Sequence, residues 1–161
     1  MPIQLMSPDA SIFDSGADAL VCPVNCVGVP GKGLALEFKK RFPEEVAMYI
    51  QNCRTRGMVA GECYMTMPSR LPFRTIFDPP WICFLPTKNH WRSSSRIEWV
   101  AQGLDSLRAH VDGLWHLKSI AIPALGCGLG GLAWADVLPL IEQFADDVDP
   151  VTVMVYPPKE G

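Results

Sequence analysis

Two glycine-rich turns are the feature of the sequence that points most directly to chemistry. The first, residues 28–33, reads Gly-Val-Pro-Gly-Lys-Gly, and the second, residues 126–131, reads Gly-Cys-Gly-Leu-Gly-Gly. Each follows an apolar run typical of a strand and precedes a helical pattern. Glycine lets backbone N–H groups approach phosphate oxygens closely, and a helix N-terminus supplies donors with no partner in the helix. The two turns therefore predict a site that could hold a diphosphate from both sides.

Neither turn fits a common nucleotide-binding motif. The second contains G-x-G-x-x-G, but only one helix and one strand are expected after it, which leaves no room for the second half of a dinucleotide-binding fold. The first has Gly31-Lys32 followed by Gly33, where a P-loop has the Ser or Thr that holds magnesium. The sequence therefore disfavours a nicotinamide-dependent enzyme and a nucleotide triphosphatase. The alternative that the glycines only permit tight turns stays open.

The elements that would position these turns alternate between strands and helices. Uninterrupted apolar runs predict strands over residues 3–6, 19–24, 62–67, 81–85, 119–122 and 151–156. Helices are expected over residues 34–42, 44–56, 96–110 and 134–144. This order predicts an α/β fold, a three-layer α/β/α sandwich around a mixed six-stranded sheet, with the ligand loops at the carboxyl ends of strands. The Pro-rich residues 68–80 predict a long, exposed insertion.

Composition narrows the class of protein. The 161 residues are 48% hydrophobic and 19% charged, with a net charge of −3, so we expect a single domain over residues 1–161 and at most local contact with nucleic acid. No apolar run approaches the roughly 18 residues of a membrane span and no signal-peptide pattern opens the chain, so we expect a cytoplasmic protein with no membrane contact. The six cysteines form no C-x-x-C pair, which favours reduced thiols, several of them in the core, and no metal site.

Four segments of the chain resemble the macrodomain family, which recognises ADP-ribose. They are residues 19–39, 85–92, 122–132 and 155–158. Within the family they are similar to the antitoxin branch that removes ADP-ribose from thymidine in DNA, and to the related protein-glutamate ADP-ribosyl glycohydrolases. The combination of Asn25-Cys26-Val27-Gly28 with Pro86-Thr87-Lys88 is the part that favours this branch. The resemblance spans nearly the whole chain and implies the three-layer macrodomain sandwich.

The resemblance implies an ADP-ribose cleft, with ADP-ribose as ligand and product and no cofactor. It implies two catalytic residues, Lys88 near the anomeric carbon and Asn25 at the distal ribose. The implied ligand-binding residues are Ser11, Cys26, Val27, Gly31, Lys32, Gly33, Leu34, Thr87, His90, Gly126, Cys127, Gly128, Leu129, Gly130, Gly131 and Tyr156. Two alternatives stay open, namely that Asn25 caps a turn and that Lys88 is an ordinary surface lysine.

The implied chemistry is cleavage of an N- or O-glycosidic bond through an oxocarbenium-like transition state. Lys88 could protonate the departing base or attack the anomeric carbon of an opened ribose. Gly130 stands where the protein-glutamate branch has an acidic residue, which favours modified thymidine in single-stranded DNA as substrate and a DNA-modifying toxin as partner. Release from protein carboxylates, and binding without turnover, are the alternatives.

The adenine end departs from the family pattern. Ser11 stands where macrodomains usually have an Asp that reads the adenine amino group, and Asp9 lies two residues earlier. We therefore expect either that Asp9 takes this role or that adenine is read through backbone groups and by stacking on Tyr156. A core position for Tyr156 is the alternative.

The residues after Lys88 suggest how a substrate could extend from the cleft. His90 and Trp91 would flank the scissile linkage, and a flipped base could stack on Trp91 with Arg92 or Arg96 at its phosphates. Packing of Trp91 against the helix that begins near residue 96 is the alternative.

Overall fold

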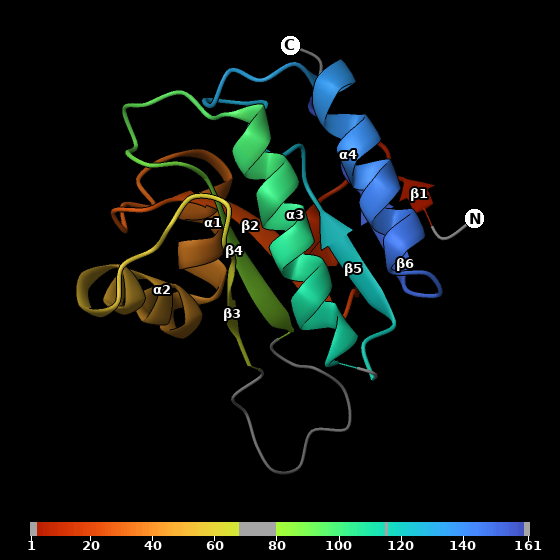
Figure 1. Ribbon diagram of the computed structural model, residues 1–161, viewed down its shortest axis with the longest axis horizontal. Helices are drawn as coiled ribbons and strands as arrows, with labels where there is room; N and C mark the ends of the chain where they lie inside the picture. Colours follow the sequence, from red (N-terminus) through yellow and green to blue (C-terminus); the bar gives the residue numbers. More distant parts are fainter. Residues whose placement is uncertain (1–2, 68–79, 115, 160–161) are drawn as a thin grey trace.

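A computed structural model describes residues 3–67, 80–114 and 116–159 of the protein (Figure 1). Its strands are β1 (Ile3–Leu5), β2 (Ala19–Asn25), β3 (Tyr64–Thr66), β4 (Trp81–Lys88), β5 (Ser119–Ile122) and β6 (Thr152–Val155). Its helices are a short 3-10 helix η1 (Ile12–Asp14), α1 (Gly33–Arg41), α2 (Pro43–Thr55), α3 (Ile97–Asp112) and α4 (Trp134–Asp147). Each predicted strand and helix is present, with ends that differ by a few residues. The predicted insertion lies almost wholly outside the described residues.

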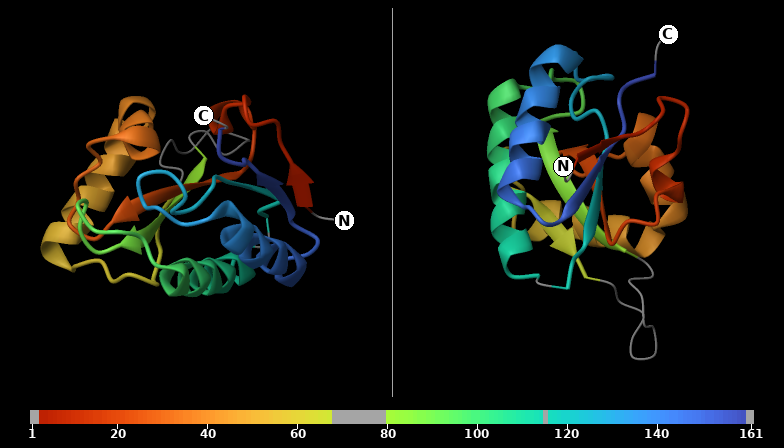
Figure 2. Two further views of the ribbon diagram at one scale, coloured as in Figure 1. Left: turned by 90° about the horizontal axis from the view of Figure 1, so that it is seen from above. Right: turned by 90° about the vertical axis from the view of Figure 1, so that its right-hand side faces the viewer.

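The six strands form one mixed sheet in the order β1-β6-β5-β2-β4-β3. Every neighbouring pair is parallel except β3 with β4, which is antiparallel. Figure 2 shows α3 and α4 on one side of the sheet and α1 and α2 on the other. The predicted three-layer sandwich with a mixed six-stranded sheet is therefore confirmed.

Two strands differ in length from the prediction, and the difference in the second one bears on the site. The strand expected over residues 62–67 is shorter because Glu62 N–H donates to Val59 O in a turn, which delays the sheet pairing to Tyr64. The strand expected over residues 81–85 instead continues to Lys88. The extension places Lys88 at the end of a sheet strand.

Strand β2 lies at the centre of the molecule and is covered on both faces. Ala19 and Val21 belong to the core under α3 and α4, whereas Leu20, Cys22 and Val24 belong to the core under α1 and α2. Successive side chains of a strand point to opposite faces, so an uninterrupted apolar run is what burial on both faces requires. The parallel strands then end together at one edge of the sheet, where the two glycine loops begin.

Helix α3 shows how the helices attach to the sheet. Its buried positions Val100, Leu104, Leu107 and Val111 recur every three or four residues and form one apolar stripe. The cysteines and the helix lengths bear on the class of protein. All six cysteines have free thiols, and Cys22 and Cys83 are buried in the core. In the described part of the chain, no helix combines the length and the apolar character that crossing a bilayer demands.

Candidate active site

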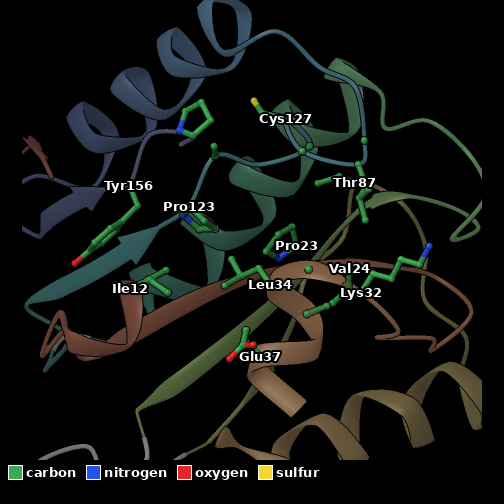
Figure 3. Close-up of a pocket in the computed structure, with 18 of the residues that line it drawn as sticks. Ile12, Pro23, Val24, Lys32, Leu34, Glu37, Thr87, Pro123, Cys127 and Tyr156 are labelled. Carbon is green, nitrogen blue, oxygen red and sulfur yellow. The ribbon is translucent and has the colours of Figure 1, made fainter. Parts of the chain in front are cut away.

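A cavity of about 1180 Å³ opens at the carboxyl ends of the parallel strands. Its wall is made by the segment around η1, the first glycine loop, the ends of β2 and β4, the second glycine loop and the residues after β6. Figure 3 shows Ile12 and Tyr156 toward one end of the cavity and Lys32 and Thr87 toward the other. The cavity is therefore elongated and has chemically different ends.

Asn25 organises the first glycine loop from the end of β2. Its side chain is 5% exposed, and its Oδ1 accepts hydrogen bonds from the N–H groups of Val27, Gly28 and Val29 at 3.1, 3.0 and 3.3 Å. Its Nδ2 donates to Val29 O at 3.0 Å. This is the turn-capping role given above as the alternative for Asn25, and it leaves one Nδ2 hydrogen for a ribose hydroxyl.

Tyr49 of α2 supports Asn25 from below, and sequence reasoning missed it. The Tyr49 hydroxyl donates to Asn25 O at 2.7 Å and lies 3.2 Å from Asn25 Oδ1. Its ring stacks on Phe84 of β4 with a centroid distance of 5.0 Å. Burial, followed by the nearby Cys53 thiol, raises the pKa of Tyr49, so its hydroxyl stays protonated and remains a donor. In the sequence Tyr49 is one more apolar position of an amphipathic helix.

Lys88 ends β4 beside the first loop. The register of the β2–β4 pair shifts by one residue after Val24, so that Asn25 is paired with Lys88. The Lys88 side chain is half-buried, lines the cavity and donates from Nζ to Trp91 O at 3.4 Å. The strand end and this bond together hold the ammonium group at the cavity wall.

Ser95 anchors the second glycine loop, and sequence reasoning missed it too. Its N–H donates to Gly130 O at 3.0 Å, and its buried hydroxyl lies 2.8 Å from the hydroxyl of Thr87. A Cβ on Gly130 would collide with Ser95 Oγ and would lie 2.6 Å from Gly126 O. The close contact therefore requires glycine at position 130. No motif singles out Ser95, because its partners lie on two other segments of the chain.

The two glycine loops approach each other across the cavity. A Cβ on Gly33 would lie 4.0 Å from Leu129 Cδ1, and Leu129 is 71% exposed. Gly128, in contrast, has no heavy atom within 4 Å of a Cβ built on it. The second loop is therefore tightly packed at Gly130, whereas at Gly128 it is open toward the cavity.

Ser11 and Tyr156 lie at the other end of the cavity. The Ser11 hydroxyl accepts from Phe13 N–H at 3.2 Å as the N-cap of η1, so it shapes the chain at this end. Asp9 also lines the cavity and is exposed. Tyr156 is buried for most of its surface, and this burial raises the pKa of its hydroxyl. An apolar floor of Ile12 and Tyr156 suits a flat aromatic ring.

The structure gathers most of the residues that the sequence pointed to. The cavity wall includes Ser11, Asn25, Gly31, Lys32, Gly33, Leu34, Thr87, Lys88, Gly126, Cys127, Gly128, Leu129, Gly130 and Tyr156. It does not include Cys26, Val27, His90 or Gly131. The backbone of Cys26 instead bonds Asn89 O at 3.0 Å and joins the first loop to the turn after β4. Wall residues that sequence reasoning missed include Phe13, Glu37, Arg41, Ser95 and Pro123.

The cavity wall is cationic although the chain has a net charge of −3. Its charged members are five cations, Lys32, Arg41, Lys88, Arg92 and Lys159, and two acids, Asp9 and Glu37, so 5 − 2 leaves a formal charge of +3. Backbone donors of the loops add to this local field, which suits an anionic ligand. Across residues 3–67, 80–114 and 116–159, no three His, Cys, Asp or Glu side chains gather in a way that could hold a metal ion.

Comparison with known proteins identifies the class of protein. The Macro domain family model matches residues 21–141, and the chain belongs to this family. The chain is 38% identical over 151 residues to a DNA ADP-ribosyl glycohydrolase of Thermus aquaticus, covering 94% of this chain and 40% of that protein. It is 33% identical over 164 residues to a DNA ADP-ribosyl transferase–DNA ADP-ribosyl glycohydrolase fusion protein of Thermosipho africanus, covering 94% and 41%. The chain thus spans about two fifths of the length of these relatives.

Solved structures agree with this assignment. The macrodomain of Mycobacterium tuberculosis DarG matches with a TM-score of 0.86 and 34% identity, covering 97% of each chain. Thermosipho africanus DarTG in complex with ADP-ribose matches with a TM-score of 0.85 and 31% identity, covering 99% of this chain and 42% of that one. The closely similar folds extend over the segments that line the cavity.

Proposed function

We propose that this protein is an ADP-ribosyl glycohydrolase that removes ADP-ribose from thymidine in single-stranded DNA. The observation that carries the proposal is the position of Lys88, at the end of β4 and in the wall of a cationic cavity between two glycine loops. Similarity to DNA ADP-ribosyl glycohydrolases along most of the chain supports it.

ADP-ribose fits the cavity in one direction. The diphosphate lies between the two glycine loops, where backbone N–H groups at the start of α1 and in the second loop can donate to it. We place adenosine at the apolar end with Ile12 and Tyr156 and the distal ribose at the end with Thr87, residues that Figure 3 labels toward opposite ends of the cavity. In this orientation the anomeric carbon is directed toward Lys88. The complex of a DarTG relative with ADP-ribose supports this choice of ligand.

Lys88 can act in hydrolysis by either of two routes. In the first, its ammonium group protonates the departing thymine while water adds to the anomeric carbon and returns a proton to the amine. In the second, the neutral amine attacks the anomeric carbon of the opened ribose, the thymine base departs with a proton that comes from this amine, and water hydrolyses the resulting imine to ADP-ribose and restores the amine. Both routes consume one water, release ADP-ribose and leave unmodified thymidine in the DNA strand.

The packing of the second loop favours DNA over protein carboxylates as the substrate. The resemblance associates an acidic residue in this loop with protein-glutamate hydrolysis, but a side chain at Gly130 would collide with Ser95 Oγ. The loop therefore cannot carry that acid without displacing Ser95 and the strand end that Ser95 holds.

A substrate of this kind requires another enzyme that attaches ADP-ribose to DNA. A relative joins a DNA ADP-ribosyl transferase and a DNA ADP-ribosyl glycohydrolase in one protein. We propose that this protein opposes a DNA ADP-ribosyltransferase toxin, whose product would be its substrate.

A direct comparison of substrates tests the proposal. The protein is given an oligonucleotide ADP-ribosylated on thymidine, as a single strand and as a duplex, and a protein ADP-ribosylated on carboxylates, and released ADP-ribose is measured. We expect release from DNA, faster from the single strand, because a stacked base must first leave the duplex at a cost of a few kcal/mol. Release from the modified protein with none from DNA would establish the alternative substrate. Binding of ADP-ribose with no release from modified DNA or modified protein would show that the protein is a binding module.

A further inference from the structure

The turn after Lys88 presents a stacked group of side chains at the mouth of the cavity. The rings of His90 and Trp91 have centroids 5.3 Å apart, and Arg92 Cζ lies 4.5 Å from the centre of the Trp91 ring. The Arg92 N–H donates to His90 Nδ1 at 3.1 Å, and Ser93 N–H donates to His90 O at 2.9 Å. The backbone of the turn is therefore held, and with it the position of the Trp91 ring.

Trp91 is more exposed than a residue of the hydrophobic core would be. It is 44% exposed, and both Trp91 and Arg92 line the cavity. This exposure argues against the alternative in which Trp91 packs against the helix that begins near residue 96, and the aromatic contact of Arg96 is with Trp99, whose ring centre lies 5.3 Å from Arg96 Cζ. Arg96 is absent from the cavity wall, so the structure separates it from Arg92.

The position and charge of the group match a chain of nucleotides leaving the cleft. Lys88 Nζ donates to the backbone oxygen of Trp91 at 3.4 Å, so Trp91, three residues further along the chain, lies beside the group assigned to the scissile bond. Among the residues that the structure describes, Arg92 forms no ion pair, and its guanidinium can donate to a phosphate. An exposed indole beside an arginine is a typical contact for a single strand, in which bases stack and phosphates pair with cations.

We propose that Trp91 and Arg92 bind the nucleotide next to the modified thymidine, with its base stacked on the Trp91–Arg92 surface and its phosphate on the guanidinium. This inference rests on the proposed function and specifies how that substrate is held at the mouth of the ADP-ribose cavity. It also accounts for DNA recognition by a protein with a net charge of −3, because the contact is local.

The experiment compares a long and a minimal substrate. Michaelis constants are measured for an ADP-ribosylated single-stranded oligonucleotide and for ADP-ribosyl thymidine, which lacks flanking nucleotides, with Trp91→Ala, Trp91→Phe and Arg92→Glu. Arg108→Glu, an exposed charge reversal on α3, is the control. Loss of one stacked base should raise the KM of Trp91→Ala for the oligonucleotide roughly 5- to 150-fold. Its KM for ADP-ribosyl thymidine should stay within about twofold.

The other variants make the expectation specific. Trp91→Phe keeps a planar ring and should restore most of the oligonucleotide affinity. Arg92→Glu should raise the oligonucleotide KM and reduce its salt dependence by a slope of about 0.7, the value for one phosphate contact on a single strand. Arg108→Glu should leave both substrates unchanged.

Several results would overturn the inference. An equal rise in KM for both substrates would mean that Trp91 contacts the modified thymidine or ADP-ribose itself. If the oligonucleotide KM values of Trp91→Ala and Arg92→Glu matched that of Arg108→Glu, Trp91 and Arg92 would have no part in DNA recognition. No release from either DNA substrate by the unsubstituted protein would overturn the proposed function together with this inference, whereas the earlier results would leave the proposed function standing.

Discussion

Asn25 and Lys88 are paired across β2 and β4 at the residue where the register of the two strands shifts. Asn25 fixes the first glycine loop through its side chain, and Lys88 is the amine assigned to the scissile bond. The pairing therefore ties the position of the proposed catalytic group to the loop proposed to bind the diphosphate. Catalysis and binding nevertheless rest on different atoms, so substitutions should separate them.

Lys88→Ala should remove turnover while largely preserving ADP-ribose affinity. Lys88 is assigned to the bond being broken, and loss of a transition-state contact lowers the rate with little effect on the ground state. We expect a rate lower by about 10²- to 10⁴-fold, as for loss of a general acid. Single-turnover release and calorimetry with ADP-ribose measure the two quantities, with Lys39→Ala on the exposed side of α1 as the control. Equal turnover in variant and parent would contradict the assignment.

Borohydride added during turnover distinguishes the two routes for Lys88. The imine route predicts a reduced covalent adduct on Lys88, found by mass spectrometry of the digested protein and missing from Lys88→Ala. Turnover with no adduct would favour proton donation.

Gly128→Glu should abolish ADP-ribose binding without unfolding the protein. A Cβ at position 128 meets no heavy atom within 4 Å, so the fold has room for a side chain, but the residue lines the cavity and the new charge would repel the diphosphate. Calorimetry and thermal unfolding check the two statements. Gly130→Ala is the matched comparison, because its Cβ collides with Ser95 Oγ and should lower the free energy of unfolding by about 1–3 kcal/mol. Unchanged affinity in Gly128→Glu would exclude the second loop from the diphosphate site.

Tyr49→Phe should destabilise the protein and weaken ADP-ribose binding. The substitution keeps the stacked ring but removes the donor to Asn25 O, and an unsatisfied buried acceptor costs about 1–3 kcal/mol. Tyr64→Phe is the control, since Tyr64 also packs on Phe84 but is only half-buried. Urea unfolding and ADP-ribose titration provide the measurements. If Tyr49→Phe and Tyr64→Phe gave the same unfolding free energy and the same ADP-ribose affinity, the support of Asn25 by Tyr49 would be rejected.

Alkaline pH should destabilise the protein in part through Cys26. Burial, followed by the neighbouring Cys53 thiol, raises the pKa of Cys26 from its ordinary value of 9.0 to about 11. The unfolded chain then loses this proton first, so the contribution to stability is complete below pH 9 and is lost as the pH rises toward about 11. Urea unfolding from pH 8 to 11 should show a shallower decline in Cys26→Ser, and the remaining decline comes from the other thiols and the tyrosines whose pKa burial raises. The same decline in variant and parent would show that Cys26 ionises alike in both states.

Sequence reasoning worked well for segments whose role is local. The helix expected over residues 96–110 is α3, because its apolar residues repeat every three or four positions whatever lies around them. It said less about the partners of single side chains in the cleft. The resemblance implies a ribose contact for Asn25, and the structure adds that the Asn25 side-chain oxygen accepts three backbone hydrogen bonds within its own loop. A residue type indicates which groups a side chain can bind, but only the fold determines which of those groups lies within hydrogen-bond distance.

The sequence by itself determined the alternation of strands and helices and the location of both glycine loops, since hydrophobic periodicity and glycine spacing act over a few residues. Only the tertiary structure decided which side chains support those loops. Tyr49 reaches Asn25 from a position 24 residues away, and Ser95 joins Thr87 to Gly130. It also separated Arg92 at the cavity from Arg96 on Trp99. These relationships depend on how β2, β4 and their neighbouring helices pack, because hydrogen bonds and ring contacts of a few ångströms form only after distant segments have been brought together.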